Sequence, residues 1–352
     1  MAASGAWGRH PRLPSKRYQR IATRKLVVRF LLIVAFLAVV PPLLFHFWLR
    51  RAAEVKSRKC GWLESVPLVC AHGGDSSRAF PNTMEAYRIA LLSNVDCVEI
   101  DVSRTSDGAL VALHDRWKQA VLSGLNHLWV RLGWDFQPGA GLIYDTGREL
   151  QLLSGNSTTK VGHLSMNEIQ QLRSGIKFPK NNQDIWVPSV TEALKLVSKS
   201  VRQVILDAKV GPPLYEKGLA ADILSTINKA GCNNCLIWSK SDTLVRDVMR
   251  LSQDVPVGYI VMRDPSTGVR TNLLRMKGSQ VVGVYHPLID EALVRTLHRV
   301  NRKVYAWTVD DTDSMKRMLF EHVDNIITGH PTRLQRIMNE IENQCLENDF
   351  LP

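Results

Sequence analysis

The chain has 352 residues, is 45% apolar and carries a formal net charge of +12, so it can build one large domain or two small ones. The positive charge lies at the N-terminus: residues 1–59 hold 13 lysines and arginines and a single acid, Glu54, and the remainder of the chain is formally neutral. A basic face on a folded domain suggests a nucleic-acid partner, but a basic tail does not. We therefore expect no nucleic-acid binding.

An apolar segment interrupts this basic tail. Residues 30–47 contain no acid, lysine or arginine, and with their apolar neighbours residues 26–49 are long enough to span a bilayer as one helix. A cleaved signal peptide and an organelle transit peptide are the alternatives. The segment is longer than a typical signal core and ends in Phe47, Trp48 and two arginines rather than in small residues, which favours an uncleaved signal anchor.

The charges that flank this segment predict its orientation. Eight lysines and arginines precede the apolar core and five follow it closely. The positive-inside rule then places the basic tail, residues 1–25, in the cytosol and the rest of the chain in the lumen or outside the cell. We expect residues 50–65 to form a linker, residues 66–340 a catalytic domain and residues 341–352 a C-terminal tail.

The six cysteines leave the compartment open. Cys232 and Cys235 have CxxC spacing, but no second pair at zinc spacing accompanies them. A structural pair or plain buried thiols are therefore favoured over a zinc site.

From Val66 onward, short β-branched or apolar runs alternate with helix-patterned stretches, which is typical of an α/β fold with a parallel sheet. Nine such runs lie between residues 68 and 327, and eight strand–helix units over this length predict a TIM (β/α)8 barrel, which leaves one run outside the barrel. An open doubly wound sheet is the alternative, although no glycine-rich phosphate motif follows the first run. The runs at 97–102 and 110–113 are too close for a parallel crossover, so we expect a hairpin or a bend there.

Acidic side chains stand near the ends of the predicted strands. Glu99 and Asp101 are two residues apart on one strand, so their carboxylates face the same side, and Asp207 ends another strand. Buried like charges need a cation, and three carboxylates without a histidine-rich or cysteine-rich cluster favour Mg²⁺ or Ca²⁺ over zinc. Lys209, just beyond Asp207, offers a positive charge to an anionic substrate.

Two histidines, His72 and His114, each end a predicted strand. A lone histidine is more often structural than catalytic, but these two accompany three carboxylates and a lysine at other strand ends. Such a set is typical of metal-assisted phosphoryl transfer, in which one histidine deprotonates the nucleophile and the other protonates the leaving oxygen.

Taken together, short motifs over roughly residues 66–335 resemble the glycerophosphodiester phosphodiesterase family, in particular its membrane-anchored plant members. They are His72-Gly73-Gly74, Pro81-Asn82-Thr83, Glu99-Ile100-Asp101, Asp107-Gly108, His114-Asp115, Asp207-Ala208-Lys209, Trp307-Thr308-Val309 and the segment from His322 to Pro331. The resemblance implies a TIM barrel that hydrolyses glycerophosphodiesters to glycerol 3-phosphate and an alcohol. It also implies catalysis by His72 and His114, a divalent cation held by Glu99, Asp101 and Asp207, and substrate binding by Lys209 and Trp307.

The chain departs from the family pattern at three positions: Gly73 stands in place of an arginine, Pro81 in place of a glutamate and Asp207 in place of a glutamate. Lys209 or Arg78 is the candidate replacement for the lost positive charge. Two alternatives to the hydrolysis of water-soluble diesters stay open. One is a lysophospholipase D that acts on lysophospholipids at the membrane, and the other is a barrel that only binds phosphodiesters.

The segment from Trp117 to Gly147 breaks the alternation of strands and helices. It has three tryptophans, five glycines and no clear period, which also fits a surface loop. Without it, the residues after His114 would run into Glu149-Leu150-Gln151 as the family pattern does. We therefore interpret the segment as an insertion beside the mouth of the active site.

Overall fold

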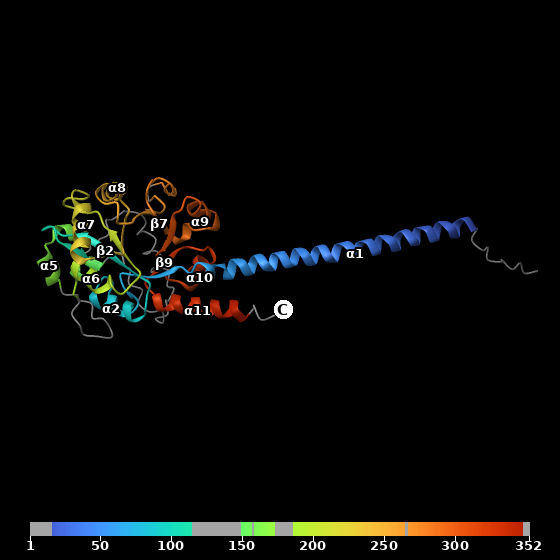
Figure 1. Ribbon diagram of the computed structural model, residues 1–352, viewed down its shortest axis with the longest axis horizontal. Helices are drawn as coiled ribbons and strands as arrows, with labels where there is room; N and C mark the ends of the chain where they lie inside the picture. The colour runs from blue at the N-terminus through green and yellow to red at the C-terminus, as the bar shows by residue number, and fades with distance from the viewer. Residues whose placement is uncertain (1–15, 115–148, 157, 173–185, 265–266, 348–352) are drawn as a thin grey trace, which may run out of the picture. The chain divides into compact units, whose positions relative to one another are not determined.

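The computed structural model describes residues 16–114, 149–156, 158–172, 186–264 and 267–347. The chain divides into two compact units, residues 1–57 and 58–352. The first unit contains most of α1 (Lys16–Cys60), which continues through Pro41 and Pro42 (Figure 1). Residues 50–60, expected as part of a linker, belong to this helix.

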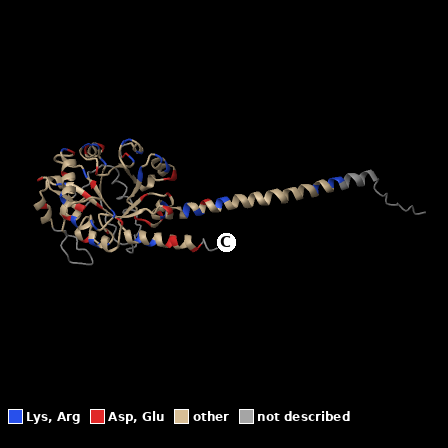
Figure 2. Cartoon of the chain, in the orientation of Figure 1, with Lys and Arg blue, Asp and Glu red and all other residues tan. Residues whose placement is uncertain are grey.

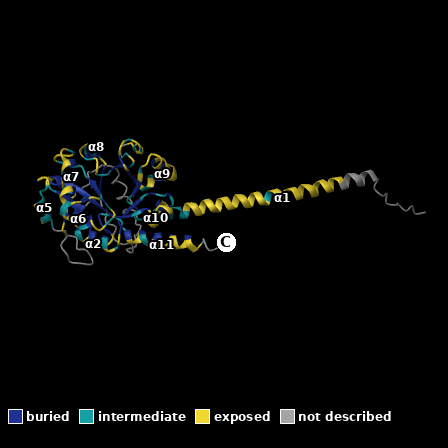
Figure 3. Cartoon of the chain, in the orientation of Figure 1, coloured by how far each residue is buried: buried dark blue, intermediate teal, exposed yellow. Residues whose placement is uncertain are grey.

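By length and composition α1 could cross a membrane. Its most apolar window has a mean hydropathy of 2.6, and none of that window is buried. Figure 2 shows lysines and arginines at both ends of the helix and a long uncharged stretch between them, and Figure 3 shows that this stretch is exposed. A signal sequence has the same features, so the boundaries of a membrane anchor at residues 26–49 stay a prediction.

The second unit is a closed parallel barrel. Its strands are β1 (Leu68–His72), β2 (Cys97–Arg104), β4 (Gln203–Ala208), β5 (Cys235–Ser239), β6 (Val257–Val261), β7 (Val281–Tyr285), β8 (Lys303–Trp307) and β9 (Asn325–Thr328). Each pairs in parallel with the next, and β9 pairs with β1 to close the ring. The predicted TIM barrel is confirmed.

One strand lies outside this ring. β3 (Leu110–Ala112) pairs antiparallel with β2, with Val102 opposite Ala112. This antiparallel pairing confirms the expected hairpin. The connection between the two strands is too short for a parallel crossover, so the chain has to turn back. β3 therefore carries the chain back along β2 and places His114 beside the barrel.

Helices surround the strands in the described part of the chain (Figure 1). They are α2 (Met84–Leu92), α4 (Glu149–Ser154), α5 (Met166–Gln171), α6 (Val190–Val197), α7 (Leu219–Ala230), α8 (Asp242–Leu251), α9 (Glu291–His298), α10 (Thr312–Phe320) and α11 (Pro331–Glu347). Short 3-10 turns are η1 (Gly61–Glu64), η2 (Val161–His163) and η3 (His286–Leu288). Several of the α-helices begin at a residue whose side chain caps the helix. At the start of α2, for example, the Thr83 side chain accepts a hydrogen bond from the Ala86 N–H. Residues 341–347, expected as a tail, belong to α11.

The core has two main layers, which decide where polar side chains can lie. Val98, Ile100 and Val102 point outward from β2 into the layer shared with the helices. A second layer fills the barrel interior and contains Cys70, Cys97, Ile205, Leu236, Trp238, Ile260, Val281, Tyr305 and Ile327. A Cβ atom at Gly283 would lie 2.4 Å from the Trp238 ring, so this glycine makes room for the indole. Since the interior is filled by apolar groups, the inward-facing acids collect at the carboxyl ends of the strands.

All six cysteines form disulfides: Cys60–Cys345, Cys70–Cys97 and Cys232–Cys235. Of the two alternatives for the CxxC motif, the structural pair is the one found. The first disulfide joins the C-terminal end of α1 to α11, and the second joins β1 to β2 inside the barrel.

Candidate active site

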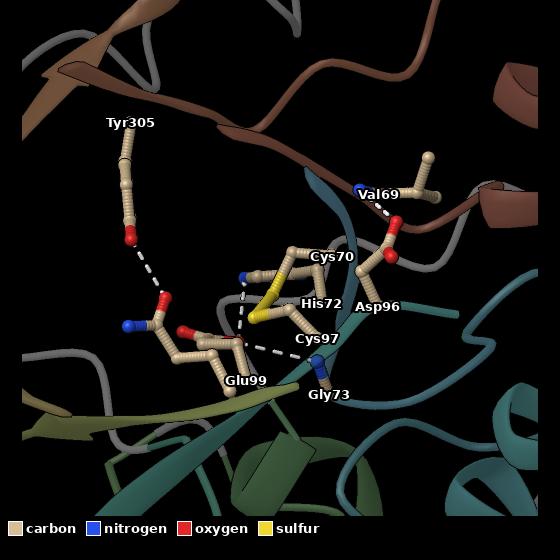
Figure 4. Close-up of a disulfide and its surroundings, with 9 residues drawn as sticks. Val69, Cys70, His72, Gly73, Asp96, Cys97, Glu99 and Tyr305 are labelled. Carbon is tan, nitrogen blue, oxygen red and sulfur yellow. Dashed lines mark hydrogen bonds and ion pairs between the residues drawn. A yellow bond between two sulfur atoms is a disulfide. The ribbon is translucent and has the colours of Figure 1, made fainter. Parts of the chain in front are cut away.

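The ends of β1 and β2 bring a histidine against a glutamate. His72 is in register with Glu99, and its Nε2 lies 3.8 Å from the Glu99 Oε2 (Figure 4). The same oxygen accepts a hydrogen bond of 3.2 Å from the Gly73 N–H. The Cys70–Cys97 disulfide crosslinks the two strands two residues before this pair, as Figure 4 shows.

Gly73 has a physical reason to be a glycine in this chain. Its φ is +61°, in the left-handed region, and a Cβ atom there would lie 3.0 Å from the Pro81 Cβ and 3.2 Å from the Asn82 nitrogen. This tight backbone directs the Gly73 N–H at Glu99. The departure from arginine thus removes a cationic side chain from a position where the backbone leaves little room for one.

The ends of β2 and β4 bring Asp101, Asp207 and Lys209 together. Asp101 is in register with Asp207, and the Lys209 Nζ lies 2.6 Å from the Asp101 Oδ1 and also contacts the Asp207 carboxylate. Burial alone would raise the pKa of Asp101, but the ammonium of Lys209, with smaller effects from the two histidines, holds it below its usual range. Burial would lower the pKa of Lys209, yet the carboxylates of Asp101 and Asp207 raise it above its usual value.

The pKa of Glu99 is shifted in the opposite direction to that of Asp101. Burial, and after it the charges of Asp101 and Asp207, raise the pKa of Glu99 well above its ordinary value. Ligand atoms of His72, Glu99 and Asp101 all lie within 4.8 Å of one another. Crowded carboxylates with one imidazole fit a divalent cation, which would relieve the repulsion that raises this pKa. Asp207, predicted as the third ligand, lies beside them in contact with Lys209.

Two further buried groups, Asn82 and Glu149, belong to the site, although the sequence motifs that contain them gave neither residue a role. The Asn82 amide donates to the Asp101 Oδ2 at 2.7 Å and to both oxygens of Glu149 at 3.0 Å, and its oxygen accepts from the Tyr87 hydroxyl at 3.0 Å. Burial, and next the charge of Asp101, raise the pKa of Glu149 well above its ordinary value. A carboxylate therefore lies next to Asn82 although Pro81 replaces the glutamate of the family pattern.

His114 follows β3 and is tied to Glu149. Its backbone N–H donates to the Glu149 Oε2 at 2.8 Å. Burial, and then the charge of Lys209, lower the pKa of the His114 imidazole well below its ordinary value. The ring is consequently neutral near neutral pH and able to accept a proton.

Two predicted substrate-binding residues remain, Trp307 and Arg78. Trp307 ends β8, with its ring 5.5 Å from that of Tyr285 and 5.4 Å from the Lys240 Nζ. Arg78, considered as a substitute phosphate ligand, contacts Asp75 at 3.8 Å and has a side chain that is 56% exposed. The segment 117–147, interpreted as an insertion, lies outside the described residues.

Comparisons with known proteins agree with this geometry. The family described as "Glycerophosphoryl diester phosphodiesterase family" matches residues 72–333. A glycerophosphodiester phosphodiesterase of Arabidopsis thaliana, GDPD4, is 50% identical over 346 residues, covering 98% of this chain and 94% of the relative. A glycerophosphodiester phosphodiesterase of Caldanaerobacter subterraneus is 26% identical and covers 78% of this chain and 98% of its own.

Solved structures share the fold. An Oleispira antarctica phosphodiesterase, determined in complex with the product sn-glycerol-3-phosphate, aligns with a TM-score of 0.60 at 20% identity and covers 78% of this chain and 97% of its own. A glycerophosphodiester phosphodiesterase of Parabacteroides distasonis aligns with a TM-score of 0.58 at 17% identity and covers 78% and 98%. At these identities the likeness shows the barrel alone.

Proposed function

Because the chain belongs to the glycerophosphoryl diester phosphodiesterase family, we propose that it hydrolyses glycerophosphodiesters to glycerol 3-phosphate and an alcohol, using a divalent cation and two histidines. The observation that carries the proposal is the cluster of His72, Glu99 and Asp101, whose ligand atoms lie within 4.8 Å of one another at the mouth of the barrel. His114 is joined to the same cluster by hydrogen bonds, because its backbone N–H donates to Glu149 and the Asn82 amide donates to both Glu149 and Asp101.

Glu99, Asp101 and Asp207 are the residues proposed to hold the cation. All three are buried, and the donors are hard oxygens, which suits Mg²⁺ or Ca²⁺. A bound divalent cation supplies Lewis acidity and neutralises the charge of the phosphate oxygens. Lys209 balances the charge of Asp101 and Asp207 and borders the substrate.

The two histidines differ in surroundings, which supports different roles. His114 has a lowered pKa and is therefore neutral, so it accepts the proton of the attacking water or glycerol hydroxyl. His72 ends β1 with its Nε2 3.8 Å from the Glu99 carboxylate, inside the cluster proposed to hold the cation, and its proposed role is to donate a proton to the leaving oxygen. Trp307 forms one wall of the substrate site.

A lysophospholipase D activity is a second candidate, and α1 is the observation that favours it. If the apolar stretch of α1 anchors the chain, the barrel stays near lysophospholipid substrates. A lumenal or extracellular barrel is part of this proposal, supported by the larger number of basic residues before the apolar core and by three disulfides, which persist in oxidising compartments.

The test compares the full-length wild type with His72→Ala on glycerophosphocholine and on lysophosphatidylcholine, each with Mg²⁺, Ca²⁺ or chelator. We expect cation-dependent release of glycerol 3-phosphate by the wild type and loss of roughly 10³-fold or more in His72→Ala. Choline release from lysophosphatidylcholine at a higher kcat/KM would identify the lysophospholipase D activity instead. Equal background rates in both proteins, together with retained binding of glycerol 3-phosphate, would leave only the binding barrel.

A further inference from the structure

We propose that Glu149 is a positioning residue of the active site, which holds Asp101 and His114 in place for hydrolysis. The inference rests on the proposed function, in which Asp101 helps to hold the divalent cation and His114 accepts a proton. Glu149 brings a carboxylate to Asn82, the neighbour of Pro81, where the chain lacks the glutamate of the family pattern.

An apolar cluster fixes Glu149 to the two segments that it contacts. α4 begins at Glu149, and its leucines are buried in the same cluster as Phe80 and Leu113. Phe80 precedes Asn82 by two residues, and Leu113 directly precedes His114. The packing of this cluster therefore sets the place of the buried Glu149 carboxylate relative to both segments.

The amide of Asn82 joins Glu149 to Asp101. Its nitrogen carries two hydrogens and lies 2.7 Å from the Asp101 Oδ2 and 3.0 Å from both oxygens of Glu149. Its oxygen accepts from the Asp101 backbone N–H at 3.1 Å and from the Tyr87 hydroxyl at 3.0 Å. Because the amide is bonded at both its nitrogen and its oxygen, a displacement of Glu149 is passed on to the Asp101 carboxylate.

Glu149 also holds the backbone of His114. The Glu149 Oε2 accepts from the His114 N–H at 2.8 Å, and the Leu113 N–H donates to the Asp101 carbonyl oxygen at 3.2 Å. The buried Nδ1 of the His114 ring has no hydrogen-bond partner in the described part of the chain. Among the described contacts, it is thus the backbone bonds that place this ring.

A carboxylate suits this position because it meets two donors at once. The N–H groups of Asn82 and His114 are satisfied by the two oxygens of Glu149. A glutamine has nearly the same shape but offers one oxygen, and its NH2 group would face one of these donors. Burial and the charge of Asp101 make an acid unfavourable here, as the raised pKa of Glu149 shows, so packing alone gives no reason for one.

The experiment compares wild type, Glu149→Gln, Glu149→Ala and the control Glu321→Gln in the full-length protein. Glu321 is a buried glutamate that follows α10 and pairs with Arg58 at 2.6 Å, so the control removes a buried carboxylate elsewhere in the second unit. The readouts are kcat and KM for a glycerophosphodiester, the Kd of Mg²⁺ and of Ca²⁺ by calorimetry, and the melting temperature.

Glu149→Gln should lower kcat and weaken cation binding by roughly tenfold to a hundredfold, because hydrogen-bond partners of a metal ligand typically contribute this much. KM should stay within about threefold, since the substrate itself is not contacted. Glu149→Ala should show the same pattern. Glu321→Gln should keep the kcat and cation Kd of the wild type even where its melting temperature falls.

A lower melting temperature of Glu149→Gln with the kcat and cation Kd of the wild type would mean a purely structural role and would overturn the inference. Should Glu149→Ala fail to fold, the nearly isosteric glutamine variant decides. Absence of hydrolysis by the wild type would instead contradict the proposed function, and the cation Kd series would still decide the role of Glu149.

Discussion

Glu99 and Asp101 stand two residues apart on one strand, and the protein shifts their pKa values in opposite directions. The difference comes from Lys209, whose Nζ lies 2.6 Å from Asp101, whereas Glu99 has a backbone N–H and a histidine beside it. Without a divalent cation, Lys209 is thus the group that makes the buried acids tolerable.

Removal of Lys209 should make the fold depend on a divalent cation. Because an uncompensated buried charge is strongly destabilising, Lys209→Met should lose roughly 3–5 kcal/mol of stability in chelator and regain much of it when Ca²⁺ or Mg²⁺ is added. Thermal melts with and without cation measure this. Lys229→Met serves as the control, because Lys229 is an exposed lysine in the last turn of α7. An equal melting temperature for Lys209→Met and wild type in chelator would contradict the role of Lys209.

Glu149 should make the stability of the folded protein depend on pH, and the raised pKa of its carboxyl group gives the direction of this dependence. Its folded pKa is raised, so the native state binds the proton more tightly than the unfolded chain does. The stability that this proton contributes is fully present below the ordinary pKa of about 4.3 and is lost as the pH rises through the folded value. Glu149→Gln has no such proton to lose. In chelator, the melting temperature of the wild type should therefore fall relative to that of Glu149→Gln as the pH rises from 5 to 8. A difference that stays constant over this range would show that the pKa of Glu149 is not raised.

At the level of elements, the contact between His114 and Glu149 bears on the segment between them. The two residues that flank positions 115–148 share a hydrogen bond of 2.8 Å, so a short connection can join them. The sequence interpretation of residues 117–147 as an insertion gains support from this closeness.

A variant that lacks residues 117–147 should therefore fold. Loop length changes stability only slowly, so we expect a cooperative melt within a few degrees of the wild type. Retained binding of glycerol 3-phosphate would show that the site is intact. Loss of the cooperative transition would mean that the segment is part of the barrel.

The strands could be predicted from short apolar runs that alternate with helix-patterned stretches, and the hairpin of β2 and β3 from the length of the connection between them. Glu99 and Asp101 were found because the two-residue period of a strand places them on one face. Glu149 gave no such signal, because its contacts with Asn82 and His114 join residues 67 and 35 positions apart. The contact between Lys240 and Trp307 gave no signal in the sequence either, because it forms only when the strands close into a barrel.

For the whole molecule, the disulfides are the feature that the sequence left open, because six cysteines allow 15 pairings. Cys60–Cys345 spans 285 residues, whereas Cys232–Cys235 spans three. In the chain-entropy account, removing the long crosslink costs on the order of 5 kcal/mol and removing the short one about 2 kcal/mol. The double variant Cys60→Ser, Cys345→Ser should thus melt well below Cys232→Ser, Cys235→Ser. Equal melting temperatures for the two variants would show that loop closure does not set their contribution.

The central claim is that buried carboxylates at the mouth of the barrel hold a divalent cation that hydrolysis requires. The most direct measurement follows cation binding by calorimetry and release of glycerol 3-phosphate from glycerophosphocholine on the same chelator-treated protein, wild type and Asp101→Asn. We predict that the wild type is inactive until Mg²⁺ or Ca²⁺ is added, and that Asp101→Asn binds the cation at least roughly tenfold more weakly with a matching loss of activity. Full activity of the wild type in chelator, or unchanged cation binding by Asp101→Asn, would contradict the claim.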